Sequence, residues 1–105
     1  MAEKIKATPE NLYNALVKLA GLYNKNMGYN IEVKHYPEDG QIGFFCQNPT
    51  MAKVNDVSMV ANAFLEDGGN VVEVNDFFGF IEVFYCDTNF REYADTMLLD
   101  IVGAL

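Results

Sequence analysis

Apolar side chains recur at helical spacing in three stretches of the chain. Before the first stretch, Thr8, Pro9 and Glu10 form a helix start signal, with a capping hydroxyl, a proline at the first helical position and an acid in the first turn. The stripe that follows ends at Gly28, a residue typical of helix C-termini. Its members are Leu12, Leu16, Leu19, Ala20, Tyr23 and Met27. The sequence therefore predicts a long helix that ends at Gly28.

Two more helices are predicted further along the chain. From Thr50 a helical pattern runs to the stop signal EDGG at 66–69, with Val54, Val57, Val60, Ala61 and Phe64 on one side. The last helix is predicted to start at the capping-box-like pair Asn89 and Glu92 and to run to the end of the sequence. Its predicted apolar stripe comprises Phe90, Tyr93, Ala94, Met97, Leu98, Ile101, Val102 and Leu105.

Strand patterns fill the gaps between these helices. The letters NIEVKHY at 30–36 alternate in polarity, and the turn chemistry of PEDG leads into QIGFFCQ at 41–47. A second pair, NVVEVND at 70–76 and GFIEVFYC at 79–86, flanks a turn at Gly79. The predicted order is α-β-β-α-β-β-α. We therefore expect one α+β domain over residues 1–105, with a four-stranded antiparallel sheet and helices packed on it.

Both faces of the predicted sheet are rich in apolar residues. Alternation assigns to the helix-covered face Ile31, Val33, Ile42, Phe44, Val72, Val74, Ile81 and Val83. The opposite face would carry Tyr36, Phe45, Phe80 and Phe84, with Glu73 and Glu82 among them. An exposed apolar patch ringed by charge usually marks a partner or self-association surface. The alternative is that the third helix covers this face and makes its rings part of the core.

The first two thirds of the chain resemble one αββ unit used twice, at a separation of about 40 residues. Gly28 and Asn30 correspond to Gly68 and Asn70, and the triplet FFC at 44–46 corresponds to FYC at 84–86. With a slip of one residue, the apolar stripes of the first two helices also match. The sequence thus suggests an internal duplication, although apolar helix stripes resemble one another by chance as well.

The formal net charge is -8, and the imbalance lies in the second half of the chain. Residues 1–50 carry five acids and five lysines, whereas residues 51–105 carry ten acids against Lys53 and Arg91. Because contacts to phosphate need lysine and arginine, we expect no direct nucleic-acid binding. The acids expected to face a partner are Glu73, Asp76, Glu82, Asp87, Glu92, Asp95 and Asp100. They form either a solvated face that keeps the protein soluble or a mimic of a nucleic-acid backbone.

Candidate catalytic residues are few. His35 is the only histidine, and on an alternating strand it is more often packed or exposed than a base. Cys46 and Cys86 lie within aromatic strand patterns, where burial would raise the thiol pKa and keep both thiols inert. No cofactor motif or zinc-ligand pattern is present in the sequence, so we expect no enzyme, no cofactor and no metal. Without a signal-peptide pattern or a membrane-spanning run, we expect a cytoplasmic protein.

The element order resembles that of the small acidic chaperones of bacterial secretion systems, whose helix, strand, strand and helix succession supports dimers. The resemblance lies in the architecture and carries over no binding residues. Those chaperones have an additional strand, which TMAKV at 50–54 would supply here at the expense of the first turns of the second helix.

Three hypotheses about function follow. In the first, the protein is a non-enzymatic binder whose acidic half docks on a basic surface of a protein partner. It would act as an inhibitor or regulator of a nucleic-acid-handling protein, for example as a phage-encoded anti-defence protein. In the second, it is a chaperone-like homodimer that holds a partner's apolar segment through Tyr36, Phe45, Phe80 and Phe84. In the third, it is a small-molecule sensor or enzyme with a pocket between sheet and helix.

Overall fold

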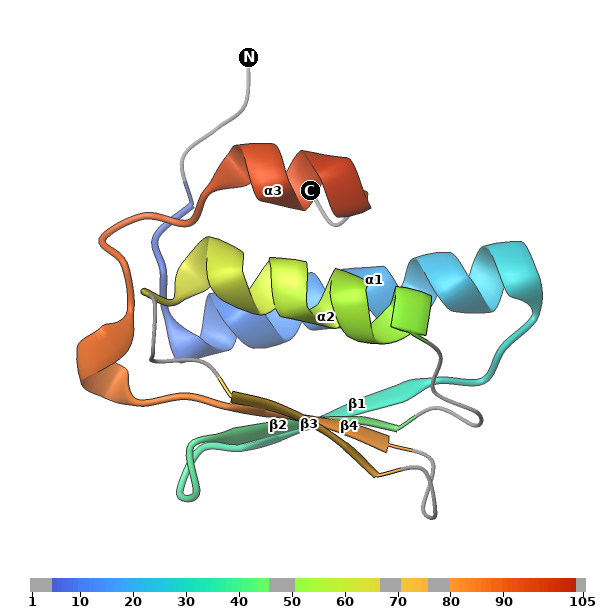
Figure 1. Ribbon diagram of the computed structural model, residues 1–105, viewed down its shortest axis with the longest axis horizontal. Coiled ribbons are helices and arrows are strands. Elements are labelled where there is room, and N and C mark those ends of the chain that lie inside the picture. Colours follow the sequence, from blue (N-terminus) through green and yellow to red (C-terminus); the bar gives the residue numbers. More distant parts are fainter. Residues whose placement is uncertain (1–4, 46–50, 67–70, 76–79, 104–105) are drawn as a thin grey trace.

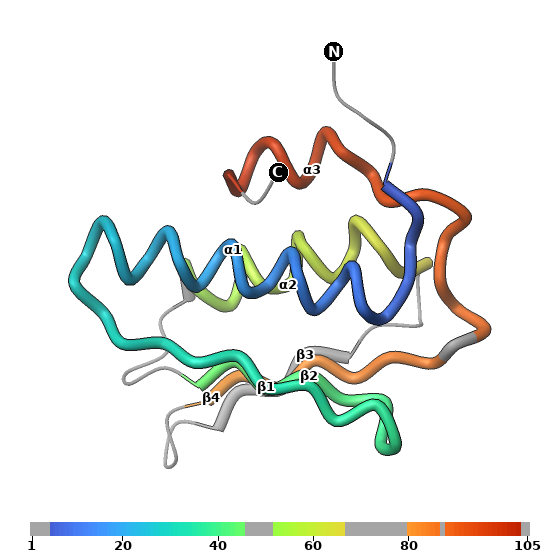
Figure 2. Tube along the Cα trace, turned by 180° about the vertical axis from the view of Figure 1, so that it is seen from behind, coloured from blue at the N-terminus to red at the C-terminus, as the bar shows by residue number. Residues whose placement is uncertain are grey.

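The computed structural model describes residues 5–45, 51–66, 71–75 and 80–103, and of residues 51, 71–75 and 87 it describes the backbone only. The elements are α1 (Pro9–Met27), β1 (Glu32–Tyr36), β2 (Gln41–Phe45), α2 (Met51–Phe64), β3 (Val71–Asn75), β4 (Phe80–Phe84), the short 3-10 helix η1 (Asp87–Asn89) and α3 (Thr96–Val102). They form three layers, in which α1 and α2 lie side by side between the sheet and α3 (Figures 1 and 2).

The strands form one antiparallel sheet in the order β1-β2-β4-β3, so that β2 and β4 are central and β1 and β3 are edges. The pairing repeats itself between the two hairpins. In the first, Glu32 pairs with Phe45, and in the second, Val71 pairs with Phe84 at the same offset along the chain. The central pair joins β2 to β4 from Gln41 opposite Phe84 to Phe45 opposite Phe80. The two hairpins are therefore related by a local two-fold axis through the middle of the sheet.

The predicted start signal of α1 is present. The Thr8 side chain accepts a hydrogen bond from the Asn11 amide at 3.1 Å, and Gly28 ends the helix in the left-handed conformation at φ 70°. Beyond the helix, both polar atoms of the Asn24 side chain bond the backbone of Ile31, at 2.8 and 3.1 Å. This double contact ties the end of α1 to the start of the sheet.

The core lies between the sheet and the two helices above it. On the covered face, Ile42, Phe44, Ile81 and Val83 are fully buried, as the alternation predicts. The helices contribute Leu12, Leu16, Leu19, Val57, Val60 and Phe64, each of which is 2 % exposed or less. Val72 and Val74 pair with Val83 and Ile81 in the register, although their side chains are outside the described part. One apolar layer thus closes one face of the sheet.

The last helix is shorter than predicted, because residues 90–95 are not helical. Their amides bond other segments: Arg91 N donates to Phe64 O at 2.9 Å, and Asp95 N donates to Ala63 O at 2.7 Å. Ala94 N donates to Ile5 O at 2.7 Å on the other side. The helix begins at Thr96, where the Asp95 side chain accepts from Met97 N. Backbone pairing with the end of α2 and with the N-terminal segment has replaced the first turns of the predicted helix.

The predicted fold class was therefore wrong in its arrangement, although the fold is α+β. The chain has η1 and an extended segment between β4 and α3, where a continuous helix was expected. Of the described helices, α1 and α2 pack on the sheet, whereas α3 packs mainly on α2, on the far side of the helix layer. The correspondence between the halves was also misaligned by one residue, because the register matches Phe45, and not Phe44, to Phe84.

Candidate partner-binding surfaces

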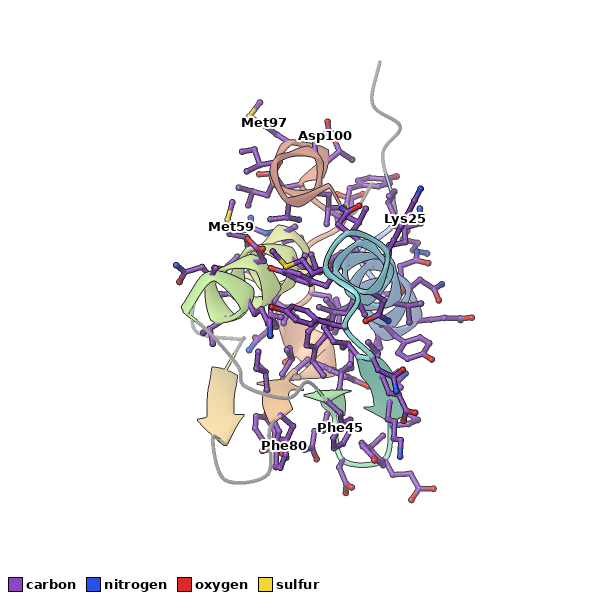
Figure 3. All side chains as sticks on the ribbon, turned by 90° about the vertical axis from the view of Figure 1, so that its right-hand side faces the viewer. Lys25, Phe45, Met59, Phe80, Met97 and Asp100 are labelled. Carbon is purple, nitrogen blue, oxygen red and sulfur yellow. The ribbon has the colours of Figure 1, made fainter. Side chains whose placement is uncertain are left out.

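The lower face of the sheet is not covered by any described element. We call it the open sheet face and define it by Glu32, Lys34, Tyr36, Gln41, Gly43, Phe45, Phe80, Glu82 and Phe84. In Figure 3 the labelled Phe45 and Phe80 point away from both helix layers. Within the described part, the alternative that the third helix covers these rings is therefore wrong. The structure places the predicted residues Tyr36, Phe45, Phe80 and Phe84 on this one face.

The rings on the open sheet face pack on one another. The centroids of Phe45 and Phe80 are 5.5 Å apart at an interplanar angle of 43°, which is an ordinary aromatic contact. The Phe45 ring also lies across Gly43, where a Cβ would come within 2.7 Å of it. Tyr36 is 39 % exposed at the corner of the sheet. Phe45, Phe80 and Phe84 are half-buried, so the aromatic rings of this face are only partly exposed.

Charged residues cross the same face. The Lys34 ammonium lies 5.4 Å from the centroid of the Phe45 ring, within cation–π range. The Gln41 amide donates to the Glu82 carboxylate, and Glu82 is paired in the register with Glu73 on the edge strand β3. Glu32 also lies on β1 on this face, so the described charges of the face are Glu32 and Lys34 on β1 and Glu82 on β4.

A second exposed apolar surface lies on α3. Met97 is 71 % exposed and Ile101 is 65 % exposed, and the labelled Met97 and Asp100 point away from the rest of the protein in Figure 3. We call Met97, Asp100 and Ile101 the α3 face. The sequence prediction placed Met97 and Ile101 in the buried stripe, but the buried side chain is Leu99, at 1 % exposure. A helix start at Asp95 was the missed signal, since aspartate is a preferred N-cap residue.

The predicted acidic residues do not form a single ridge. Glu92, Asp95 and Asp100 are exposed on or next to α3, whereas Glu82 lies on the open sheet face, on the other side of the helix layer. Asp76 lies outside the described residues, and the side chains of Glu73 and Asp87 are not described. The described members of the predicted acidic set thus lie on two sides of the helix layer.

The cations of the second half contribute little exposed positive charge. Lys53 is 3 % exposed, with its ammonium 4.1 Å from the centroid of the Tyr29 ring. Arg91 is half-buried, and its Nε donates to Asn62 O at 3.1 Å. In the N-terminal segment, Lys6 forms an isolated antiparallel β-bridge with Tyr93, which precedes α3. No lysine or arginine occurs between Glu92 and Gly103.

His35 belongs to an aromatic cluster between α1 and the edge of the sheet. Its ring stacks on Tyr13 with centroids 5.5 Å apart, and its Nε2 lies 2.7 Å from the Tyr85 hydroxyl. Burial lowers the pKa of His35 below 6.5, and the nearby Glu10 carboxylate opposes this by raising it. A neutral imidazole bonded to a tyrosine and stacked on another fits a packing role.

The prediction of a buried Cys86 was wrong. Strand β4 ends at Phe84, and Cys86 is exposed, with its Sγ 3.1 Å from the Thr88 hydroxyl. Cys46 lies outside the described residues. Among the described residues, no group of three His, Cys, Asp or Glu side chains could hold a metal ion.

Family models, curated proteins and solved structures were compared with the chain, and none of them matches. The additional strand of the secretion chaperones is not supplied by residues 51–54, which form the first turn of α2. In the part of the chain that the structure describes, no helix is long and apolar enough to span a bilayer.

Proposed function

We propose that this protein is a small non-enzymatic binding protein that docks through its α3 face on a basic surface of a protein partner. The observation that carries the proposal is the grouping of exposed Met97 and Ile101 with the exposed acids Glu92, Asp95 and Asp100. An apolar centre with a charged rim is the usual composition of a protein interface.

The charge of this surface selects the kind of partner. From Glu92 to Gly103 the chain carries three acids and no lysine or arginine. Such a segment repels phosphate and attracts lysine and arginine, and complementary charge raises the rate of association at low salt. Met97 and Ile101 would supply the apolar contacts that the charges alone do not give.

A basic protein surface often serves to bind nucleic acid, and the proposal therefore includes a role as an inhibitor or regulator. Carboxylates on this segment would occupy positions that backbone phosphates take on the partner. A phage-encoded anti-defence protein would fit this description. Two cysteines in 105 residues are not the dense disulfide framework of a small secreted domain, and we include a cytoplasmic location in the proposal.

The experiment is affinity capture from the native host with three forms of the protein. We expect the wild type to recover a basic protein at low salt and to lose it at high salt, because screening weakens exposed charge pairs. Asp100→Lys should abolish recovery of that protein. The matched control is Glu38→Lys, the same charge reversal at an exposed turn residue on the sheet side, and it should leave recovery unchanged.

Recovery of the same protein by Asp100→Lys, or recovery that salt does not change, would disprove docking through the α3 face. Met97→Ser tests the apolar contribution without changing charge, and it should weaken binding of the purified partner. The mimicry is tested separately, by competition with a duplex oligonucleotide for that partner. If the oligonucleotide does not compete, docking stands and the mimicry is wrong.

The chaperone-like alternative depends on the other exposed surface. Tyr36, Phe45, Phe80 and Phe84 do lie together on the open sheet face, which this alternative requires. The face also carries the charged residues Lys34 and Glu82, whereas an extended apolar segment is usually held in an apolar groove. The proposal therefore rests on the α3 face.

A further inference from the structure

We propose that the free edge of β1 binds an extended segment of a partner protein. The segment would add a fifth strand to the sheet and place two apolar side chains in the groove between β1 and α1. In the order β1-β2-β4-β3, one side of β1 has no neighbouring strand among the described residues. The site is separate from the α3 face, which lies on the far side of the helix layer, so the inference goes beyond the proposed function.

The hydrogen bonds of the sheet show which way the backbone groups of β2 are directed. Tyr85 N donates to Gly40 O at 2.8 Å, and this bond continues the register of β2 with β4. Successive residues of an antiparallel strand direct their N–H and C=O groups to one neighbour and to the other in turn. Ile42 and Phe44, which alternate with Gly40, therefore bond β4. Positions 41, 43 and 45 are left to bond β1.

The same alternation identifies the groups on the free edge of β1. The register partners of positions 41, 43 and 45 are positions 36, 34 and 32. The two residues between them, Val33 and His35, therefore direct N–H and C=O away from β2. No group in the described part of the chain bonds these outward N–H and C=O groups. Such a row of backbone groups is a site for pairing with another strand.

The preceding position on this edge shows which chemistry fits there. Ile31 directs its backbone the same way as Val33, and it is already bonded. Asn24 Oδ1 accepts from Ile31 N at 2.8 Å, and Asn24 Nδ2 donates to Ile31 O at 3.1 Å. The carboxamide thus makes both bonds that a residue of an antiparallel strand makes to its partner. Amide chemistry already occupies the edge at Ile31, and Val33 and His35 offer the same pair of bonds to another backbone.

A groove of about 420 Å³ lies beside this edge, where α1 runs above β1 (Figure 2). Its lining includes Tyr13, Val17, Ala20 and Gly21 from α1 and Ile31 and Val33 from the strand side. Val17 is 41 % exposed, and no other described segment lies within 4 Å of where a Cβ on Gly21 would be. Glycine is unfavourable inside a helix, and here no described neighbour requires it. It suits the close approach of a bound chain.

The two faces of the added strand define the chemistry of the partner segment. Residues opposite Val33 and His35 would share their face and enter the groove, where apolar side chains fit. The residue between them would lie opposite Lys34, where an acid makes a favourable cross-strand pair, and a basic residue would suit the position opposite Glu32. The occupant is therefore an extended segment with apolar residues at alternate positions and an acid between them.

A second copy of β1 fits this edge less well. Antiparallel pairing through both Val33 and His35 would place Lys34 opposite Lys34 of the second copy, which is a repulsive pair. Pairing shifted to place Lys34 opposite Glu32 would bring His35 opposite Ile31, whose outward groups are bonded to Asn24. The edge therefore favours a different chain.

The test is a titration of isotope-labelled protein, followed by NMR and amide hydrogen exchange. The probe is the blocked peptide acetyl-Ser-Val-Glu-Val-Lys-Ser-amide, whose valines would lie opposite His35 and Val33. In the free protein we expect the amides of Val33 and His35 to exchange faster than that of Lys34, which bonds β2. Saturation with the peptide should slow the exchange of both. The control peptide carries N-methyl groups on the two valines, which removes the donors and keeps the side chains, and its dissociation constant should be about tenfold higher or more.

A variant of the protein tests the groove. Gly21→Leu fills it from an exposed helical position and should raise the dissociation constant of the peptide by about tenfold or more. The matched control Asn26→Leu, exposed on α1 outside the groove, should leave binding unchanged. Circular dichroism confirms that both variants are folded.

Four outcomes would overturn the proposal. They are no binding at millimolar peptide, equal binding of the N-methylated peptide, binding that Gly21→Leu leaves unchanged, and exchange at Val33 and His35 in the free protein as slow as that at Lys34. Asp100→Lys should bind the peptide as the wild type does, because the α3 face is not involved. The two proposals therefore fail separately.

Discussion

Phe44 and Phe45 are neighbours on β2, and their side chains lie on opposite faces of the sheet. Phe44 points into the helix layer and is fully buried, whereas Phe45 lies across Gly43 on the open sheet face. The same alternation holds on β4, where Ile81 and Val83 are buried and Phe80 and Phe84 are partly exposed. Phenylalanine therefore occurs on both faces of this sheet, but the charged residues of the described strands lie on the open face.

The difference shows what an apolar residue contributes in each place. On the covered face, side chains from two helices fill the space above the sheet, so each ring contributes to the free energy of unfolding. On the open face, Phe45 and Phe80 contact each other, and the rings stay partly exposed. A group of partly exposed aromatic residues marks a candidate partner surface.

The largest expected effect is the difference in lost unfolding free energy between alanine substitutions at Phe44 and at Phe45. Phe44→Ala should lower the free energy of unfolding by about 3–5 kcal/mol, because it leaves a cavity in the core. Phe45→Ala, at concentrations where the protein is monomeric, should cost about 1 kcal/mol through lost contact with Phe80. Urea unfolding followed by circular dichroism measures both.

Equal losses for the two substitutions would mean that the open sheet face is covered in solution. Measuring the unfolding of both variants at several protein concentrations shows whether a second copy covers the face. If the cost of Phe45→Ala rises with protein concentration while that of Phe44→Ala does not, the extra contribution comes from self-association.

A smaller effect is expected at Gly43. A methyl group there would come within 2.7 Å of the Phe45 ring, so the ring must move away and lose its contact with Phe80. We expect Gly43→Ala to cost about 1 kcal/mol in the wild type. In the Phe45→Ala background it should instead stabilise by about 0.5 kcal/mol, since alanine is favoured over glycine in a strand.

The double-mutant cycle over Gly43 and Phe45 therefore has a predicted sign change. Additive effects would show that the Phe45 ring does not lie over Gly43.

The smallest effect concerns His35, on the covered side of the edge strand. Its folded-state pKa is lowered by burial, so the unfolded chain binds a proton more readily. The contribution of His35 to stability is therefore fully present above pH 6.5 and is lost as the pH falls through the lowered folded-state pKa. Unfolding free energies measured between about pH 8 and about pH 5 should decrease toward low pH.

His35→Gln keeps a side chain that can bond the Tyr85 hydroxyl and cannot titrate in this range. It should flatten the dependence on pH. The matched control is Tyr36→Phe on the open sheet face, which should leave the dependence unchanged. A wild-type profile as flat as that of His35→Gln would show that the ring is not desolvated.

The predictions that the structure confirms depend on residues that are close together in the sequence. The cap of α1 at Thr8 and its end at Gly28 depend on side chains within a few residues, and the structure has both. The alternation on β2 and β4 likewise assigned Phe44 and Phe45 to the correct faces. The start of α3 was missed, because residues 90–95 match a helical pattern and are held extended by amide bonds to Phe64, Ala63 and Ile5. No local pattern reveals those partners.

The same distinction between local sequence signals and long-range contacts applies to the candidate surfaces. Sequence reasoning found the rings of the open sheet face and the acids near α3, because charge and alternation can be read from neighbours. It missed Met97 and Ile101, since their exposure depends on where the helix starts and on which side meets α2. It also joined Glu82 to the acids of α3, although the helix layer separates them.

The sequence by itself determined the α+β class, the long helix α1, the turn at 37–40, the two-faced strands and the negative charge of the second half. These depend on residue type and short-range spacing. The predicted turn at Gly79 lies outside the described residues. Only the tertiary structure decided that α3 packs on helices and leaves the sheet face open, and that the acids divide between two sides. Such outcomes depend on which segments meet across long separations in the chain, where burial and backbone hydrogen bonding outweigh local preference.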